Sequence, residues 1–220
     1  MLYQYMVLAM TICAGFGFVY GLIHLIWPRK AQYTHMIVYG MGCVMIGRLF
    51  QTVSIFAFGE LTSGFNLGML GIIGCFQFFF TANYGVMDSL VDDGSEKFRK
   101  IRLIALAAPA VILALFGVYV YFAGIGVATV VRFAGVLIIA ATAYLHLKHI
   151  LIEDVEFGLI RALRRYNIVG LAYAVLTMLE IIVATAPVSP FFLMIVYQLI
   201  CIVYLLIIPE LEKGVKKWTI

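Results

Sequence analysis

Charged residues are scarce in this chain. They make up 12% of its 220 residues, whereas hydrophobic residues make up 65%. Soluble domains carry about 25% charged residues, so a soluble globular fold is excluded. A membrane-spanning helix needs about 20 mostly apolar residues, and seven such stretches with short connections use almost the whole sequence. We therefore predict an all-α polytopic membrane protein, a seven-transmembrane-helix bundle that forms a single domain over residues 1–220 and contacts the lipid bilayer.

Motifs for chemistry are absent as well. The four cysteines lie singly in apolar segments without CxxC spacing, so neither a disulfide framework nor a zinc site is expected. No HExxH, P-loop or GxSxG motif occurs. The histidines His24, His35, His146 and His149 fall toward one side of the predicted membrane, and we interpret them as interfacial residues rather than haem or metal ligands. We predict neither an enzyme nor a metal site.

Basic residues are concentrated in every second connection between the predicted spans. Thirteen of the 15 lie beside the loops after the first, third and fifth spans or in the tail after the seventh, while the opposite loops are short and contain one acidic residue, Glu60. The positive-inside rule then places the N-terminus outside and the C-terminus in the cytoplasm of the cell (inner) membrane. The same sorting leaves no basic face for nucleic acid. The predicted spans are 5–27, 36–58, 65–87, 103–124, 127–149, 166–186 and 190–211.

Small residues recur inside these spans. Gly47 lies in the second span, Gly68 and Gly71 in the third, and Gly117 in the fourth. In lipid, packing replaces the hydrophobic effect as the force that joins helices, and small residues allow close approach. We expect helix contacts at these positions.

Two charged residues lie far from the ends of their predicted spans. Arg48 belongs to the second span and Glu180 to the sixth. A charge in mid-membrane is costly unless it has a partner or a water-filled cavity, so we predict that Arg48 and Glu180 pair directly or through water. Such a pair can serve function or act only as a latch between two helices.

Other polar residues form stripes at helical spacing, which puts each stripe on one helix face. Because facing lipid would be costly, we expect the stripes to face the inside of the bundle. They could relay protons, hold a ligand or make ordinary interhelical hydrogen bonds. The stripes are Gln77, Thr81, Tyr84 and Asp88 in the third span; Thr142, His146, His149 and Glu153 in the fifth; Tyr173, Thr177 and Glu180 in the sixth; Tyr197, Cys201 and Tyr204 in the seventh; and Tyr20 and His24 in the first.

A few of these positions match a known pattern. They are Gln77, Thr81 and Asp88 in the third span, Arg132 and Phe133 in the fifth, and Arg164, Arg165, Asn167 and Tyr173 around the sixth. In topology and at these residues the chain resembles the microbial rhodopsin superfamily, which implies a seven-helix fold with the N-terminus outside. The lysine that binds retinal in that family would fall near Cys201, and the proton acceptor is replaced by Gln77. Covalent retinal is therefore not expected.

These observations favour a rhodopsin-like sensor or receptor-type protein that binds a small ligand or relays protons. The identity of any cofactor stays open, and a cytoplasmic or membrane signalling partner and a homo-oligomer are both compatible with the sequence. The alternative is a small-solute or ion transporter or channel with a three-plus-one-plus-three helix arrangement. The pairs Phe76-Gln77 and Tyr197-Gln198 are a weak sign of the internal sequence repeat that such an arrangement implies. The candidate ligand or proton pathway consists of Arg48, Gln77, Thr81, Asp88, Tyr173, Glu180 and Tyr197.

Overall fold

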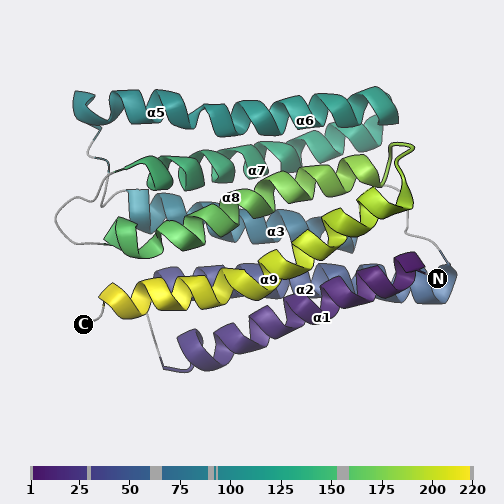
Figure 1. The fold of residues 1–220 in the computed structure, drawn as a ribbon, viewed down its shortest axis with the longest axis horizontal. Helices are drawn as coiled ribbons and strands as arrows, with labels where there is room; N and C mark the ends of the chain where they lie inside the picture. Colours follow the sequence, from purple (N-terminus) through teal and green to yellow (C-terminus); the bar gives the residue numbers. More distant parts are fainter. Residues whose placement is uncertain are drawn as a thin grey trace.

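The computed structural model is a bundle of long helices that lie roughly side by side (Figure 1). It describes residues 2–28, 31–59, 66–88, 92, 94–152 and 159–218, in which all regular structure is helical. The elements are α1 (Leu2–Gly21), the π-helical turn η1 (Leu22–Ile26), α2 (Gln32–Phe58), α3 (Leu67–Ala82), the π-helical η2 (Asn83–Asp88), the 3-10 turn η3 (Glu96–Phe98), α5 (Arg99–Ala105), α6 (Ala107–Ala123), α7 (Val127–Leu151), α8 (Leu159–Val183) and α9 (Pro190–Trp218).

Among the residues that the structure describes, seven helices are long and apolar enough to cross a membrane, which confirms the predicted number. Their positions also agree with the prediction, although several helices extend beyond it. The fourth begins at Glu96 rather than at residue 103, and the sixth begins by Arg161 rather than at residue 166. The observed spans are Tyr3–Ile26, Gln32–Phe58, Leu67–Gly85, Glu96–Ala123, Val127–Leu151, Arg161–Val183 and Pro190–Lys216.

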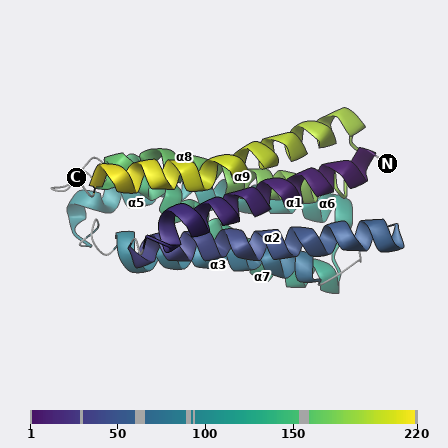
Figure 2. The ribbon, with the colours of Figure 1, turned by 90° about the horizontal axis from the view of Figure 1, so that it is seen from below.

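Six helices surround the core, and one lies outside them. In the order α1, α2, α3, α7, α8 and α9, each helix contacts the next, and α9 contacts α1 again. The helix α6, which forms most of the fourth span, packs against α7 and α8 at the edge of the bundle (Figures 1 and 2). Because the number of spans is odd, the chain termini lie at opposite ends. We call these the N-terminal end and the C-terminal end of the bundle.

Local sequence explains where several helices begin and end. The Asn66 side chain accepts a hydrogen bond from the backbone N–H of Met69 (3.0 Å) and so caps the start of α3. Gly59 ends α2 with a positive φ of 80°, a conformation that residues with a β-carbon rarely adopt. Pro190 is the first residue of α9, where its missing N–H is tolerated.

The backbones of α2 and α3 approach each other closely. A β-carbon on Gly71 would lie 2.5 Å from the Cys43 carbonyl oxygen and 2.7 Å from the Gly47 α-carbon. The predicted role of small residues is thus confirmed for this pair of helices. For Gly117 the prediction is wrong, because this residue is exposed at the edge of the bundle and a β-carbon there would have no neighbour within 4 Å.

Candidate functional site

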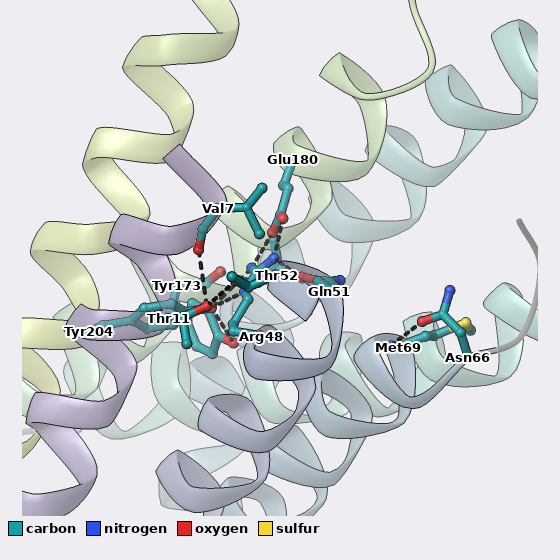
Figure 3. Close-up of polar contacts among 11 residues, drawn as sticks. Val7, Thr11, Arg48, Gln51, Thr52, Asn66, Met69, Tyr173, Glu180 and Tyr204 are labelled. Atoms are coloured by element: carbon teal, nitrogen blue, oxygen red, sulfur yellow. Dashed lines mark hydrogen bonds and ion pairs between the residues drawn. The ribbon is translucent and has the colours of Figure 1, made fainter. Parts of the chain in front are cut away.

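Arg48 of α2 and Glu180 of α8 form an ion pair in the bundle interior, which confirms the predicted pairing (Figure 3). The two terminal guanidinium nitrogens donate to the two carboxylate oxygens at 2.5 and 2.6 Å. The Arg48 side chain is 1% exposed and that of Glu180 is 12% exposed. This fork-to-fork geometry is the strongest arrangement available to the two groups.

The remaining N–H groups of Arg48 are also used. Nε and one terminal nitrogen donate to the Tyr204 hydroxyl at 3.1 and 3.0 Å, and the other terminal nitrogen donates to Gln51 Oε1 at 2.9 Å. The Tyr173 hydroxyl lies 3.4 Å from that of Tyr204. A guanidinium carries five N–H groups, and all five have acceptors here. Any further hydrogen-bond capacity at this pair therefore belongs to Glu180, which is the less buried partner.

A cavity of about 510 Å³ lies next to the ion pair. Arg48, Gln51 and Glu180 line one part of it, and it extends to residues at the N-terminal end such as Asn66 and Thr185. The volume lies within the range of small-molecule sites. Tyr197, a predicted site residue, lines the same cavity. Its apolar lining consists of Val7, Met69, Ile72, Ile73, Val136, Ile139, Ile181 and Ala184.

Aromatic residues close the core on the other side of the ion pair. Tyr173 stacks on Phe76 with ring centroids 4.8 Å apart, and Phe79 packs edge-on against Tyr166 and His146. All of these side chains are fully buried. The structure therefore places a dense apolar layer between the cavity and the C-terminal end.

Three of the predicted stripes do face inward. In α7, Thr142, His146 and His149 are fully buried, and His146 Nδ1 lies 2.9 Å from Asn167 Oδ1 of α8. In α8 and α9 the buried members include Tyr173, Thr177, Tyr197 and Tyr204. Glu153, which ends the α7 stripe, lies outside the described residues. The stripe of the first span faces inward only in part, because Tyr20 is half-buried and donates to Glu212 at 2.6 Å, whereas His24 is exposed.

The stripe in the third span is a correction. Gln77, Thr81 and Tyr84 are exposed on the outer surface of the bundle, so the expectation that they face inward is wrong. The opposite face of α3 carries Phe76 and Phe79, which are large and apolar and take the core position. Spacing showed correctly that the polar residues share one face, but it did not show which way that face points. A proton path from the ion pair through Gln77 has no geometric basis.

Asp88 belongs to a separate cluster at the C-terminal end, beyond the third span. Lys148 lies 2.7 Å from Asp88 and 2.5 Å from Asp92, and Arg102 lies 2.9 Å from Asp92. His149 Nε2 lies 3.4 Å from Asp88. Burial raises the pKa of Asp88, but hydrogen bonds from His149 and Lys148 outweigh it, and the pKa lies below the ordinary value of this group. The cluster ties the start of α5 and the end of α7 to the segment that follows α3.

Several partners in these clusters are not among the predicted site residues. Gln51 lies one helical turn after Arg48, so helical spacing alone puts the two on one face. Tyr204 belongs to the predicted stripe of the seventh span, and its contact with Arg48 adds it to the site. Lys148, Asp92 and Arg102 lie near helix ends, where the sequence gives no sign that Lys148 is buried, at 4% exposed.

Comparisons were made with protein-family models, with curated proteins and with solved structures, and none of them matches this chain.

Proposed function

We propose that this chain is a sensor or receptor-type seven-helix protein of the cell (inner) membrane, which binds a small ligand in the cavity beside Arg48 and Glu180. The N-terminal end faces outward and the C-terminal end faces the cytoplasm, as the sorting of basic residues indicates. The observation that carries the proposal is a cavity of about 510 Å³ with a buried ion pair in its lining. Largely apolar pockets with a few convergent polar groups are the usual form of ligand sites.

The chemistry of the lining suggests what such a ligand looks like. Because all N–H groups of Arg48 are taken, the free acceptor is Glu180, and the ligand carries a hydrogen-bond donor toward it. Ile73, Val136 and Ile139 contact its apolar body. Covalent retinal is not expected, since α9 contains no lysine before Lys213 and has Cys201 where a rhodopsin would bind retinal.

The dense layer of Tyr173, Phe76 and Phe79 favours a receptor over a carrier. A carrier must open a path from its site to the other side of the membrane, and these buried rings would have to separate. A receptor needs only to convert ligand binding into a small shift of packed helices, which is the ordinary repertoire of such bundles. The signal would pass to a cytoplasmic or membrane partner.

The test is to purify the protein in mild detergent, record its absorption spectrum and identify by mass spectrometry the small molecules released on denaturation. Ala184→Trp should block the cavity, because Ala184 lines it near the N-terminal end. Ala123→Trp is the control, since Ala123 is also exposed at that end but does not line the cavity. We expect one bound molecule per chain in the wild type and the control, and none in Ala184→Trp.

Two results would contradict the proposal. One is a folded wild-type protein with no bound molecule, and the other is equal retention by Ala184→Trp and Ala123→Trp. Solute uptake or proton flux above that of empty liposomes would support the transporter instead.

A further inference from the structure

The exposed face of α3 carries polar groups into the middle of the membrane. Gln77 lies near the centre of the third span, Leu67–Gly85, and is exposed on the outer surface. Its side-chain amide has no hydrogen-bond partner among the residues that the structure describes, whereas the Thr81 hydroxyl donates to the Gln77 backbone carbonyl at 2.8 Å. Hydrocarbon chains offer neither donors nor acceptors, so an amide left at this depth is costly.

The same face continues on both sides of Gln77. Leu70, which is 43% exposed, lies about two turns before Gln77, and Tyr84, which is 59% exposed, lies about two turns after it. Tyr84 stacks on Phe80, with ring centroids 5.5 Å apart and the planes 6° from parallel. We call Leu70, Gln77, Thr81 and Tyr84 the α3 face. It combines an apolar end, two polar groups and an aromatic pair along one side of a helix, as interhelical contacts in membranes do.

From this face we infer that the protein forms a homodimer through α3, in which the Gln77 amides of two copies bond to each other. A two-fold axis along the membrane normal brings identical faces together and keeps both copies inserted in the same direction. Each glutamine amide both donates and accepts, so two copies of Gln77 satisfy each other reciprocally. A different protein would need its own polar side chain at the same depth, whereas a second copy supplies it by symmetry.

Gln198 of α9 provides a matched control. It is also exposed within a membrane span, but it lies only about a third of the way along Pro190–Lys216, closer to the end of its span, and its exposed neighbours Leu199 and Ile202 are apolar. If exposure of a glutamine alone drove association, the two positions would behave alike. The inference from the α3 face requires that they differ.

The experiment introduces single cysteines into a background in which Cys13, Cys43, Cys75 and Cys201 are replaced by alanine. Leu70→Cys and Leu199→Cys keep Gln77 in place and are similarly exposed, at 43% and 42%. Each is purified, reconstituted into liposomes at low density and oxidised with copper phenanthroline. We expect a disulfide-linked dimer for Leu70→Cys and monomer for Leu199→Cys. No cross-link at Leu70→Cys, or an equal one at Leu199→Cys, would overturn the inference.

A second measurement avoids the cysteine-free background in case it does not fold. Wild-type protein with donor and acceptor dyes at its N-terminus is diluted with lipid, and energy transfer reports dissociation. Gln77→Leu should dissociate at about tenfold higher protein-to-lipid ratio, the size expected for a lost interhelical hydrogen bond, whereas Gln198→Leu should follow the wild type. Identical curves for all three proteins would refute the interface. Neither outcome bears on the ligand cavity, because neither Gln77 nor Gln198 lines it.

Discussion

Replacing Glu180 by leucine should destabilise the bundle strongly. The variant keeps a side chain of similar size but removes both carboxylate oxygens, which accept from Arg48 at 2.5 and 2.6 Å. The guanidinium, 1% exposed, is then left with the Tyr204 hydroxyl and the Gln51 amide oxygen as its acceptors. Its full positive charge stays inside the bundle without a counter-charge.

The expected loss follows from this burial. Removing one partner of a buried ion pair costs about 3–5 kcal/mol, because the other charge stays buried and unpaired. Glu180 is 12% exposed and lines a cavity that water can enter, so the lower end of that range applies to Glu180→Leu. Arg48→Met should cost a similar amount for the same reason. The double variant contains no buried charge, and apolar residues of similar volume can replace a buried pair at little cost.

The assay is reversible unfolding of the purified protein in mixed detergent micelles, followed by circular dichroism. The four proteins form a double-mutant cycle. We expect each single variant to unfold at clearly lower denaturant, and the double variant to lie within about 1 kcal/mol of the wild type. If the double variant lost the sum of the two single losses, Arg48 and Glu180 would not stabilise each other, and the geometry would have been misread.

Three further predictions concern packing, polar contacts and pH. Gly71→Ala should destabilise the protein by about 1–3 kcal/mol, because its β-carbon would meet α2, whereas Gly117→Ala, which adds a β-carbon in open space, should leave thermal unfolding unchanged or slightly improved. Tyr204→Phe removes an acceptor from Arg48 and should cost about 1.5–3 kcal/mol in the same unfolding assay, with an unchanged midpoint refuting the role of the hydroxyl. Asp88→Asn should lower the melting temperature at pH 7, because the folded-state pKa of Asp88 is depressed. The stabilisation by the ionised carboxylate is complete above about pH 4 and is lost as the pH falls through the lowered pKa, so the melting temperatures of variant and wild type should converge in acid. A difference that stays constant with pH would contradict the ion pairs.

The sequence was sufficient for the spans and for the central pair. Apolar runs of about 20 residues have one structural solution in lipid, and two lone charges inside such runs have few ways to avoid an unpaired state. This is why Arg48 and Glu180 could be paired across 132 positions of the chain.

The arrangement of the helices could not be predicted in the same way. Helices that are apolar on every side give little sign of which face is buried, so the sequence did not place α6 outside the circuit of the other six. In α3 the polar residues marked one face correctly, but Phe76 and Phe79 compete for the core from the opposite face and take it. The α2–α3 glycine contact and the partners of Lys148 depend on how neighbouring helices meet, which only the three-dimensional structure shows.

The most direct test of the ligand site is an experimental structure of the purified protein in lipid, at a resolution that shows side chains. We expect an additional molecule in the cavity beside Arg48 and Glu180, with a donor atom within hydrogen-bond distance of the Glu180 carboxylate and an apolar part against Ile73 and Val136. A cavity that holds only water, or one filled by the protein's own side chains, would contradict it.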